Sequence, residues 1–584
     1  MTPLDWSLVI GLNLFTICVG IVISRGAKNS SEWFLAGRTL GWWTIGLSLY
    51  ATAIDASDLV ADSGGVYTLG LTYFVYNWVG NIFGWLLAAH VVTLVMYRQG
   101  MYTNAEYLEA RFGPMARIIS ALVQIQYRTM VLGIIANTLY LTLTIVCDWD
   151  QGAWLAVGVI AFIATLYTMW GGLKSVVITD ALQSVVMITA AVILLITVWR
   201  EVGGWEGAAQ KLKNHEVDLP NQILRVGHDQ VEAVNVSQLS HEEIDRLLSM
   251  GGEYDPMNSK IVKTTPAWLV CLAFIIAGMS YAIVNHTQSM RLLGAKSEWD
   301  LKMAVVLASA IILVATFLNL MVGIFGRALI PDPSLMNLSN PALQTPDSIY
   351  PLLVRDLLPV GLKGLVVAGI LAASFSTFDS IGSTLSALIT RDLYARLIYQ
   401  NGSDRHYLKF GRWLTPVIIF GSLGYIPFLQ GGGMLLFYLD LVGAIVVPLL
   451  TVYLMGTMTC VHRRTGTMGL IIGVSYGVLR LVTPVLVARW GWSPLPPIML
   501  NGFAAYPFSL LATAIPMLIA SSVWGWQSPQ ELRIHESKGW LAKSSEQIST
   551  AIKLQTTQKS HPLPLYLGMG LLCIGIFLSF YVFW

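Results

Sequence analysis

One long apolar segment of this chain contains a carboxylate surrounded by hydroxyl groups. Asp379 lies in the middle of the segment from Leu371 to Thr384, which contains no Lys or Arg. A charged side chain at bilayer depth costs roughly 2.5–3.5 kcal/mol or more, so it needs a partner and marks a functional site. The spacing i, i+3, i+4, i+7 places the following residues on one helix face: Ala373, Ser376, Thr377, Ser380 and Thr384. This row of oxygens favours a small hard cation as the missing charge.

The composition indicates a protein with many membrane-spanning segments. Of the 584 residues, 55% are hydrophobic and 12% are charged, whereas soluble domains carry about 25% charged residues. The net charge of +2 gives no reason to expect nucleic acid as a partner. The five cysteines show neither metal-ligand spacing nor an obvious pairing. Because no Walker A loop, zinc-protease motif or nucleophile elbow is visible either, we do not expect an enzyme.

Apolar runs of about 20 residues, the length that spans a bilayer, recur along the chain. We therefore predict an all-α polytopic membrane protein with about fourteen transmembrane helices. The expected spans are 5–24, 41–68, 70–97, 115–146, 153–170, 175–199, 266–288, 300–328, 361–392, 409–429, 431–460, 467–490, 503–523 and 563–584.

Basic residues concentrate in the odd-numbered connections, among them Arg291 in the seventh and Arg391 and Arg396 in the ninth. By the positive-inside rule these connections are cytoplasmic. This predicts a multi-pass protein of the plasma (inner) membrane with both termini outside, loop 200–265 extracellular and loop 524–562 cytoplasmic.

Two spans have the composition of interrupted helices, which expose backbone groups for ion and substrate sites in many transporters. Span 41–68 contains Asp55, Asp58 and Asp62 ahead of a glycine pair, and span 266–288 becomes polar towards Asn285. Alternatively, Asp62 and the glycines lie at the outer surface, and the second span simply runs out into the cytoplasm. Two interruptions five spans apart predict a 5+5 inverted repeat.

Asp180 is a further carboxylate in an apolar setting, in the sequence from Trp170 to Asp180. Two interpretations stay open. In the first, Asp180 forms a salt bridge with Lys174, six residues earlier or about 9 Å along a helix. In the second, it is a carboxylate of a second cation site.

Four motifs, in order along the chain, resemble those of the sodium/solute symporter family. They are Phe34 to Trp43, Trp170 to Asp180, Asn285 to Arg291 followed by Gly294 to Ser297, and Ala372 to Thr377 running on to Thr390 to Tyr394. The resemblance covers roughly residues 5 to 460, and the last three helices match the sugar-transporter branch in number. It implies a LeuT-type core. The domains expected are an N-terminal helix and loop (1–38), a first repeat (39–199), the loop 200–265, a second repeat (266–460) and three peripheral helices (461–584).

Carried over residue by residue, the resemblance implies a first sodium site. Its expected ligands are the carbonyls of Ala51, Ile54 and Ala373 and the side chains of Ser376 and Thr377. It also implies a second cation site formed by Asp180, Ser376, Asp379 and Ser380. Here the chain departs from the family, which usually has a serine at the position of Asp379. The additional acid would raise cation affinity or stay protonated and couple transport to a proton.

The substrate positions of the family fall here on Asp58, Asn77, Asn285, Asn319 and Leu439. Asparagines at 77 and 319 replace a charged pair of the sugar transporters. Amides and one carboxylate can bind the hydroxyls of a sugar or polyol, whereas Asp58 without a basic partner could bind an organic cation instead.

These residues together predict a sodium-coupled symporter that imports a small polar solute, first of all a sugar or polyol, by alternating access. Its expected partners are the sodium ion, the solute and the lipid bilayer, and no cofactor is expected. Other classes stay open: a proton-coupled relative, a symporter of organic cations, amino acids or other nutrients, and a transporter-like sensory module. Against the last, the loop 524–562 is too short for a kinase.

Overall fold

The computed structural model describes residues 1–24, 30–149, 152–236, 243–244, 247–248, 252–255, 259–338, 340–429, 433–533, 539–555 and 561–584. The predicted loops 200–265 and 524–562 therefore lie partly outside the described residues. Outside these two loops, nearly all of the described elements are helices, because in a bilayer the backbone must satisfy its own hydrogen bonds.

The helices of the first half are α1 (Pro3–Ser24), α2 (Ser30–Leu35), α3 (Trp42–Ala53), α4 (Ala56–Leu69), α5 (Ile82–Leu87), α6 (Thr93–Arg98), α7 (Asn104–Phe112), α8 (Pro114–Cys147), α9 (Gly152–Val202), α10 (Gly204–His215) and α11 (Leu219–Leu224). Four short helical segments join them: η1 (Ala36–Arg38), η2 (Gly70–Tyr73), η3 (Tyr76–Asn81) and η4 (Ala88–Val92). Three antiparallel strands follow, β1 (Gln230–Asn235), β2 (Glu253–Asp255) and β3 (Lys260–Thr265), in the order β1-β3-β2.

The helices of the second half are α13 (Ala267–Val284), α14 (His286–Leu293), α15 (Glu298–Leu329), α16 (Ile349–Leu357), α17 (Leu362–Leu388), α18 (Asp404–Ser422), α19 (Ile426–Leu429), α20 (Met434–Leu441), α21 (Val447–Met458), α22 (Thr465–Trp490), α23 (Pro497–Leu500), α24 (Ala505–Trp524), α25 (Trp540–Gln555) and α26 (Leu563–Phe577). Their short segments are η6 (Pro333–Leu335), η7 (Pro341–Leu343), η8 (Pro346–Ser348), η9 (Ile389–Ile398), η10 (Leu423–Tyr425), η11 (Val442–Val446) and η13 (Leu578–Val582).

Eleven helical segments within the described residues are long and apolar enough to cross a membrane. Three predicted spans are not among them. Span 41–68 is divided into α3 and α4, the part of α9 before a kink at Gly172 is short, and α18 contains four charged residues. The count of fourteen therefore stays a prediction.

Both predicted interruptions are confirmed, and at both a polar side chain caps the start of the second helix. α3 ends at Ile54, and the side chain of Asp55 accepts the backbone N–H groups of Ser57 and Asp58 to start α4. Asn285 likewise ends α13 and accepts the N–H of Thr287 at 3.0 Å to start α14. Asp and Asn are favourable N-cap residues because their short side chains satisfy the free amides of a first turn.

One of the two alternatives to interrupted helices is wrong. Asp62 is only 5% exposed, and Gly64 and Gly65 are buried within α4, so these residues lie inside the protein. After Asn285 the chain continues as α14, in which every residue is buried, instead of leaving the bundle.

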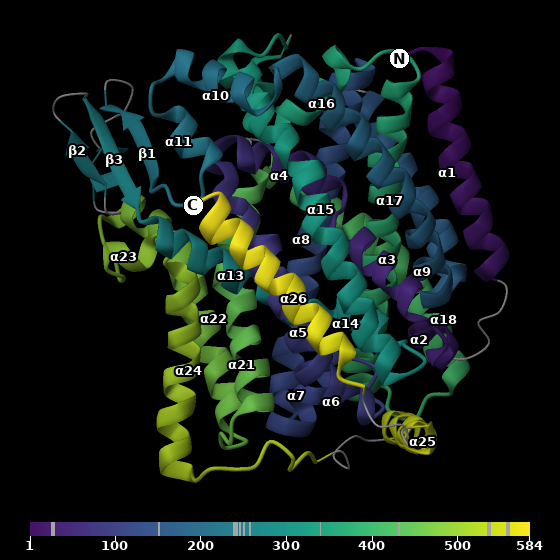
Figure 1. Ribbon diagram of the computed structural model, residues 1–584. Coiled ribbons are helices and arrows are strands. Elements are labelled where there is room, and N and C mark those ends of the chain that lie inside the picture. Colours follow the sequence, from purple (N-terminus) through teal and green to yellow (C-terminus); the bar gives the residue numbers. More distant parts are fainter. Residues whose placement is uncertain are drawn as a thin grey trace.

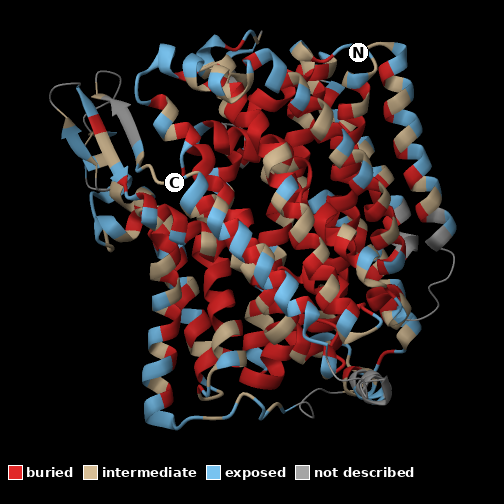
Figure 2. Cartoon of the chain, viewed as in Figure 1, coloured by how far each residue is buried: buried red, intermediate tan, exposed pale blue. Residues whose placement is uncertain are grey.

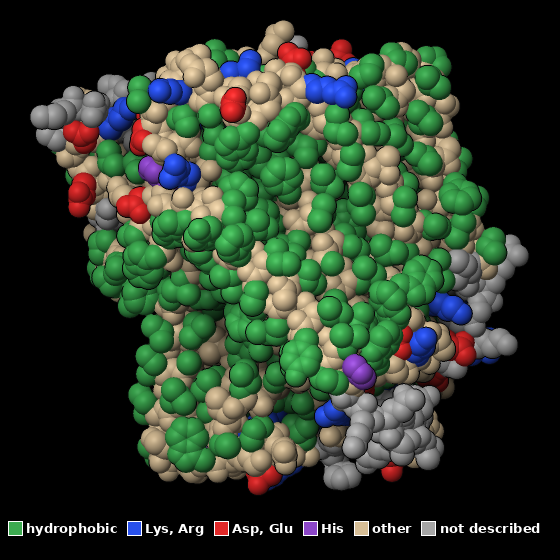
Figure 3. All heavy atoms as spheres, viewed as in Figure 1, with side chains coloured by type: hydrophobic (Ala, Val, Ile, Leu, Met, Phe, Trp, Pro, Cys, Tyr) green, Lys and Arg blue, Asp and Glu red, His purple; other side chains and the backbone are tan. Residues whose placement is uncertain are grey.

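α9 packs against α3, α15 and α17, and α3 packs against α15 and α17. Buried residues concentrate in the middle of the bundle, whereas α1 and α24 at its edges and α26 across its front expose much of their surface (Figure 2). On the face shown in Figure 3, hydrophobic side chains cover the middle and charged side chains lie mainly towards the two ends. This distribution suits a surface surrounded by lipid.

The two ends of the bundle differ in what they carry. Both chain termini point towards the end with α10, α16 and the sheet, and α25 lies at the opposite end (Figure 1).

Gly172 is a position inside the bundle at which the fold requires a glycine. Gly172 kinks α9 with φ +64°, and a Cβ there would lie 2.8 Å from the Trp33 ring.

Candidate functional site

A buried group of polar side chains joins four helices in the centre of the bundle. We call Ser48, Asp180, Arg291, Ser376 and Ser380 the Asp180 cluster; all five are fully buried. Arg291 Nη2 donates to Asp180 Oδ2 at 2.7 Å and to Ser380 Oγ at 2.5 Å. Arg291 Nε donates to Ser48 Oγ at 2.6 Å, and Ser48 Oγ donates to Asp180 Oδ2 at 2.5 Å. The ion pair is thus enclosed by hydroxyl groups that satisfy its remaining oxygens and N–H groups.

The partner of Asp180 is Arg291, and the salt bridge to Lys174 is not formed, since Lys174 is exposed. The assignment of Arg291 to a cytoplasmic connection was also wrong. The break at Asn285 lets a second short helix, α14, continue inside the bundle, and this helix brings Arg291 to Asp180.

The residues predicted for the first sodium site lie together where α3 ends beside α17. Ser376 Oγ lies 3.3 Å from the Ala51 carbonyl oxygen and 2.6 Å from Asp180 Oδ1, and Thr377 Oγ1 donates to the Ala373 carbonyl at 3.1 Å. Ile54 is the residue at the helix break itself. Because α3 stops here, its last carbonyls lack helical partners and can face a cation.

The residues predicted for the second cation site are also neighbours. Ser380 Oγ donates to Asp379 Oδ1 at 3.2 Å and accepts from Arg291, and Ser376 and Arg291 both contact Asp180. The sequence prediction did not include the guanidinium of Arg291 in this site. With both acids ionised, Asp180, Asp379 and Arg291 carry charges of −1, −1 and +1, a sum of −1.

A polar cavity lies beside the break between α3 and α4. Its volume is about 30 Å³, enough for roughly one water and far below the ~300 Å³ of a small-molecule site. The helices around it must therefore separate before a solute can occupy it. Its lining residues are Asp55, Ser57, Asp58, Ala61, Asp62, Tyr73, Tyr76, Arg128, Val131, Ile134, Tyr281, Met434, Leu435 and Tyr438.

Of the five predicted substrate residues, only Asp58 lines this cavity. Asn285 caps α14, Asn77 accepts from Asn81 Nδ2 at 3.4 Å, and Asn319 lies beside the hydroxyl of Tyr50. The Leu439 carbonyl oxygen accepts a hydrogen bond from the Tyr506 hydroxyl at 2.7 Å.

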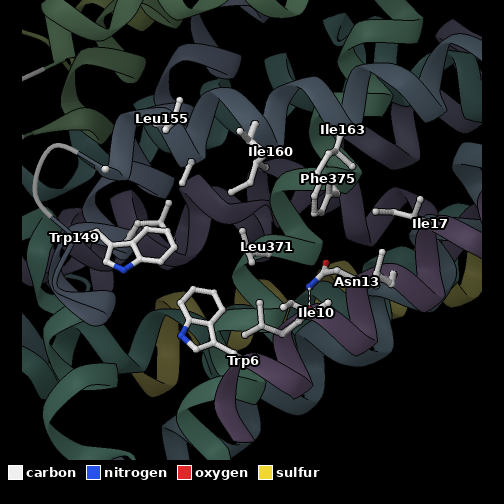
Figure 4. A pocket seen from close by; sticks show the side chains of 16 residues that line it. Trp6, Ile10, Asn13, Ile17, Trp149, Leu155, Ile160, Ile163, Leu371 and Phe375 are labelled. Carbon is white, nitrogen blue, oxygen red and sulfur yellow. Dashed lines mark hydrogen bonds between the residues drawn. The ribbon is translucent and has the colours of Figure 1, made fainter. Parts of the chain in front are cut away.

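A larger groove of about 770 Å³ between α1, α9 and α17 does not have the chemistry of a polar-solute site. Apolar side chains line it almost throughout, and Trp6 and Trp149 stack at one end with ring centroids 5.3 Å apart (Figure 4). Among the described residues of its lining, Asn13 is the one polar side chain that is not aromatic. The small cavity, with its carboxylates and hydroxyls, is therefore the candidate solute site.

The family model for the "Sodium:solute symporter family" matches residues 33–474, three quarters of the chain. The chain belongs to the sodium:solute symporter family. It is therefore a multi-pass membrane transporter and not an enzyme, with sodium as its coupling ion and a small solute as its cargo.

Curated relatives agree with this assignment. Sodium/myo-inositol cotransporter 2 of Sus scrofa is 26% identical and aligns over 97% of this chain and 83% of its own length. Sodium/glucose cotransporter 4 of Homo sapiens is 27% identical and aligns over 82% of this chain and 69% of its own length. A solved sodium-coupled sialic acid symporter is 18% identical, covers 90% of this chain and 99% of its own, and superposes with a TM-score of 0.69. At that identity the likeness shows the fold alone, which is of the LeuT type.

Sequence reasoning missed several residues around the cavity of this symporter. Arg128 on α8 is 2% exposed, and its Nε and Nη2 have no hydrogen-bond partner among the described residues. It lies within the predicted span 115–146, so the rule that singled out Asp379 would also have found it. The missed tyrosines, Tyr73, Tyr76, Tyr281 and Tyr438, carry no comparable signal because aromatic residues are common in apolar spans.

Asp347 of η8 contacts Met434, a residue that lines the symporter cavity. Its Oδ2 accepts the backbone N–H of Met434, a cavity residue, at 3.1 Å. A Cβ on Gly64 of α4 would lie 2.4 Å from Asp347 Oδ1, so the loop rests directly on α4. Burial raises the pKa of the Asp347 carboxyl to about 6, although the backbone N–H groups of Met434 and Gly433 oppose the shift.

We expect the folded state to lose stability as the pH rises, because burial disfavours the ionised form of the Asp347 carboxyl. An acid whose pKa increases on folding, here from 3.8 to about 6, stabilises the folded state fully below the lower value. That contribution is lost as the pH rises through about 6. A shift of two pKa units corresponds to a contribution of about 3 kcal/mol to the free energy of unfolding. The thermal unfolding midpoint should therefore fall more between pH 4.5 and 7.5 in the wild type than in Asp347→Asn, and equal falls would contradict this.

Proposed function

We propose that this symporter imports a neutral polyhydroxyl solute, a sugar or polyol, together with sodium. The observation that carries the proposal is the composition of the cavity beside the broken helix. Four tyrosines, three aspartates and one arginine surround it, so it offers both donors and acceptors to a ring of hydroxyl groups. Two relatives are named as cotransporters of sodium with myo-inositol and with glucose, and these names agree with this solute class.

The hydrogen-bonding groups of the cavity, and not its net charge, support a polyol as the solute. Asp58 Oδ2 already accepts the Asp55 backbone N–H at 2.6 Å, and Asp62 Oδ2 accepts from Tyr73 at 3.0 Å. Arg128, on the same cavity wall, repels a cation but can donate to hydroxyl oxygens. The Tyr438 hydroxyl lies 3.3 Å from that of Tyr76 and extends this polar surface.

Sodium coupling in this proposal uses the junction of α3 and α17. Sodium would bind the carbonyls of Ala51, Ile54 and Ala373 and the hydroxyls of Ser376 and Thr377, and so hold the two helices together. A second cation would bind near Asp180, Ser376, Asp379 and Ser380. The two acids, Asp180 and Asp379, each contact a serine of this group, which supports either one additional sodium ion or a proton on one acid. Entry of one monovalent cation down 100 mV supplies about 2.3 kcal/mol.

The proposed cycle requires two halves that rock against each other. We assign residues 39–199 and 266–460 to the two inverted repeats, residues 1–38 to an additional N-terminal helix and loop, and residues 461–584 to peripheral helices. We place loop 200–265 outside a plasma (inner) membrane and loop 524–562 in the cytoplasm, with both termini outside. The basic residues of the odd connections support this orientation.

Transport by purified protein in lipid vesicles tests the solute and the coupling together. We expect an inward sodium gradient to accumulate labelled myo-inositol or glucose, and an equal potassium gradient at the same pH not to do so. The membrane potential at which net uptake reverses gives the number of sodium ions per solute. Uptake of a choline-like cation or an amino acid in place of both polyols would contradict the solute class.

A further inference from the structure

Six charged side chains form a buried network at the end of the bundle that carries α25. Arg117 Nη1 donates to Glu109 at 2.6 Å, and Arg117 Nε donates to Asp392 at 2.7 Å. Arg391 Nη2 donates to Glu106 at 2.9 Å, and Arg396 Nη2 lies 2.7 Å from Glu109. We call these six residues, Glu106, Glu109, Arg117, Arg391, Asp392 and Arg396, the end network. Its three basic and three acidic groups balance in charge.

In the cycle proposed above, on which this inference rests, the end network joins the two repeats that separate when this end of the solute path opens. Arg391, Asp392 and Arg396 belong to η9, the continuation of the sodium-site helix α17, whereas their partners belong to α7 and α8. Burial raises the pKa of Glu106, but Arg391 and Arg117 outweigh it and hold that pKa below its usual value. Separation breaks these ion pairs, and while water is excluded no solvent replaces the lost partners, so the network favours the closed state at this end.

Helix α25 covers one member of the network directly. The Cζ of Arg391 lies 3.6 Å from the ring centroid of Tyr102 and 4.6 Å from that of Trp540, the first residue of α25. A guanidinium over an aromatic face is attracted electrostatically, and more strongly when water is excluded. Arg391 Nη2 also donates to Ser544 Oγ of α25 at 3.4 Å.

The start of α25 is held in register by two further contacts. The Trp540 ring stacks on Tyr407 of α18, with centroids 4.5 Å apart. Gly539 has φ +60°, and a Cβ there would lie 2.3 Å from the Gln400 carbonyl oxygen, just beyond η9. The backbone of α25 therefore approaches η9 as closely as a glycine permits. Figure 1 shows α25 at this end, apart from the long helices of the bundle.

We propose that α25 is a latch on this end of the solute path and that Trp540 is its positioning residue. While Trp540 covers Arg391, η9 stays paired with α7 and α8. When α25 leaves, water reaches Arg391 and the end network can open. The rate at which the symporter opens towards this side is thus set partly by a helix that touches neither the sodium residues nor the cavity.

The test compares Trp540→Ala with two matched variants in the full-length protein in lipid nanodiscs. Trp540→Phe keeps an aromatic face over Arg391, and Lys543→Ala removes an exposed side chain of the same helix. We expect amide hydrogen exchange across 389–398 and 104–112 to be about tenfold faster in Trp540→Ala, and within twofold of wild type in the other two. The sodium concentration for half-maximal uptake should rise in Trp540→Ala alone, because an easier opening on this side depletes the sodium-binding outward state.

A second variant displaces α25 without removing its aromatic side chain. Gly539→Ala places a methyl group against the Gln400 carbonyl, so it should lift the start of α25 and give the same faster exchange. It also serves as the test if Trp540→Ala does not fold, as judged by size-exclusion chromatography. Faster exchange confined to residues 539–555, with 389–398 unchanged in the folded variants, would show that α25 only packs on the surface and would overturn the proposal.

Discussion

The double substitution Ser376→Ala, Thr377→Ala should reduce sodium-dependent uptake to the background level. The Ser376 hydroxyl lies 3.3 Å from the Ala51 carbonyl oxygen of α3, and the Thr377 hydroxyl bonds the Ala373 carbonyl, a predicted sodium ligand. The two substitutions remove both hydroxyls while the helix backbone stays intact. A hydroxyl that interacts with a charged group contributes about 1.5–3 kcal/mol. Loss of two such groups therefore weakens sodium binding by about a hundredfold or more. Uptake by vesicles at a series of sodium concentrations measures this effect.

The matched control is Ser374→Ala, Ser383→Ala, which removes two hydroxyls from the same helix. Both are buried, and each donates to a carbonyl of α17 itself: Ser374 to Ile370 at 2.9 Å and Ser383 to Ser380 at 3.2 Å. This control should keep sodium stimulation near the wild-type level. Normal sodium stimulation in Ser376→Ala, Thr377→Ala would show that the first sodium site lies elsewhere.

The breaks in the two helices could be predicted from the sequence because their cause is local. Asp55 and Asn285 each cap the following helix with their own side chain, and polar residues of this type inside an apolar span are visible without a structure. Neighbours along one helix, such as Ser376 and Thr377, could be predicted for the same reason.

The position of Arg291 could not be predicted in this way because its partner is 111 residues away in the chain. A basic residue that follows an apolar span has the pattern of a cytoplasmic loop, and only the packing of α14 shows that it is buried. The predicted solute residues and the cavity lining differ for another reason. Consecutive residues on a helix point about 100° apart, so the predicted residue Leu439 and the lining residue Tyr438 face different directions.

Replacement of Arg291 by Met should be among the most destabilising single changes in this protein. The Asp180–Arg291 pair is fully buried, and removal of one partner from such a pair costs about 3–5 kcal/mol because the other charge stays buried. The same substitution at Arg98, which is 52% exposed in its pair with Glu298, should cost no more than about 1 kcal/mol. Thermal unfolding midpoints of the two purified variants measure the difference.

The double variant Asp180→Asn, Arg291→Met separates the structural from the functional contribution of the pair. With neither charge present, the desolvation cost disappears, and we expect most of the lost stability to return. Sodium coupling should not return with it, because Asp180 Oδ1 contacts Ser376, a predicted sodium ligand, at 2.6 Å. If the double variant were no more stable than Arg291→Met, the buried charge would not be the cause. Recovery of both stability and coupling would instead make the pair purely structural and would remove Asp180 from the proposed second cation site.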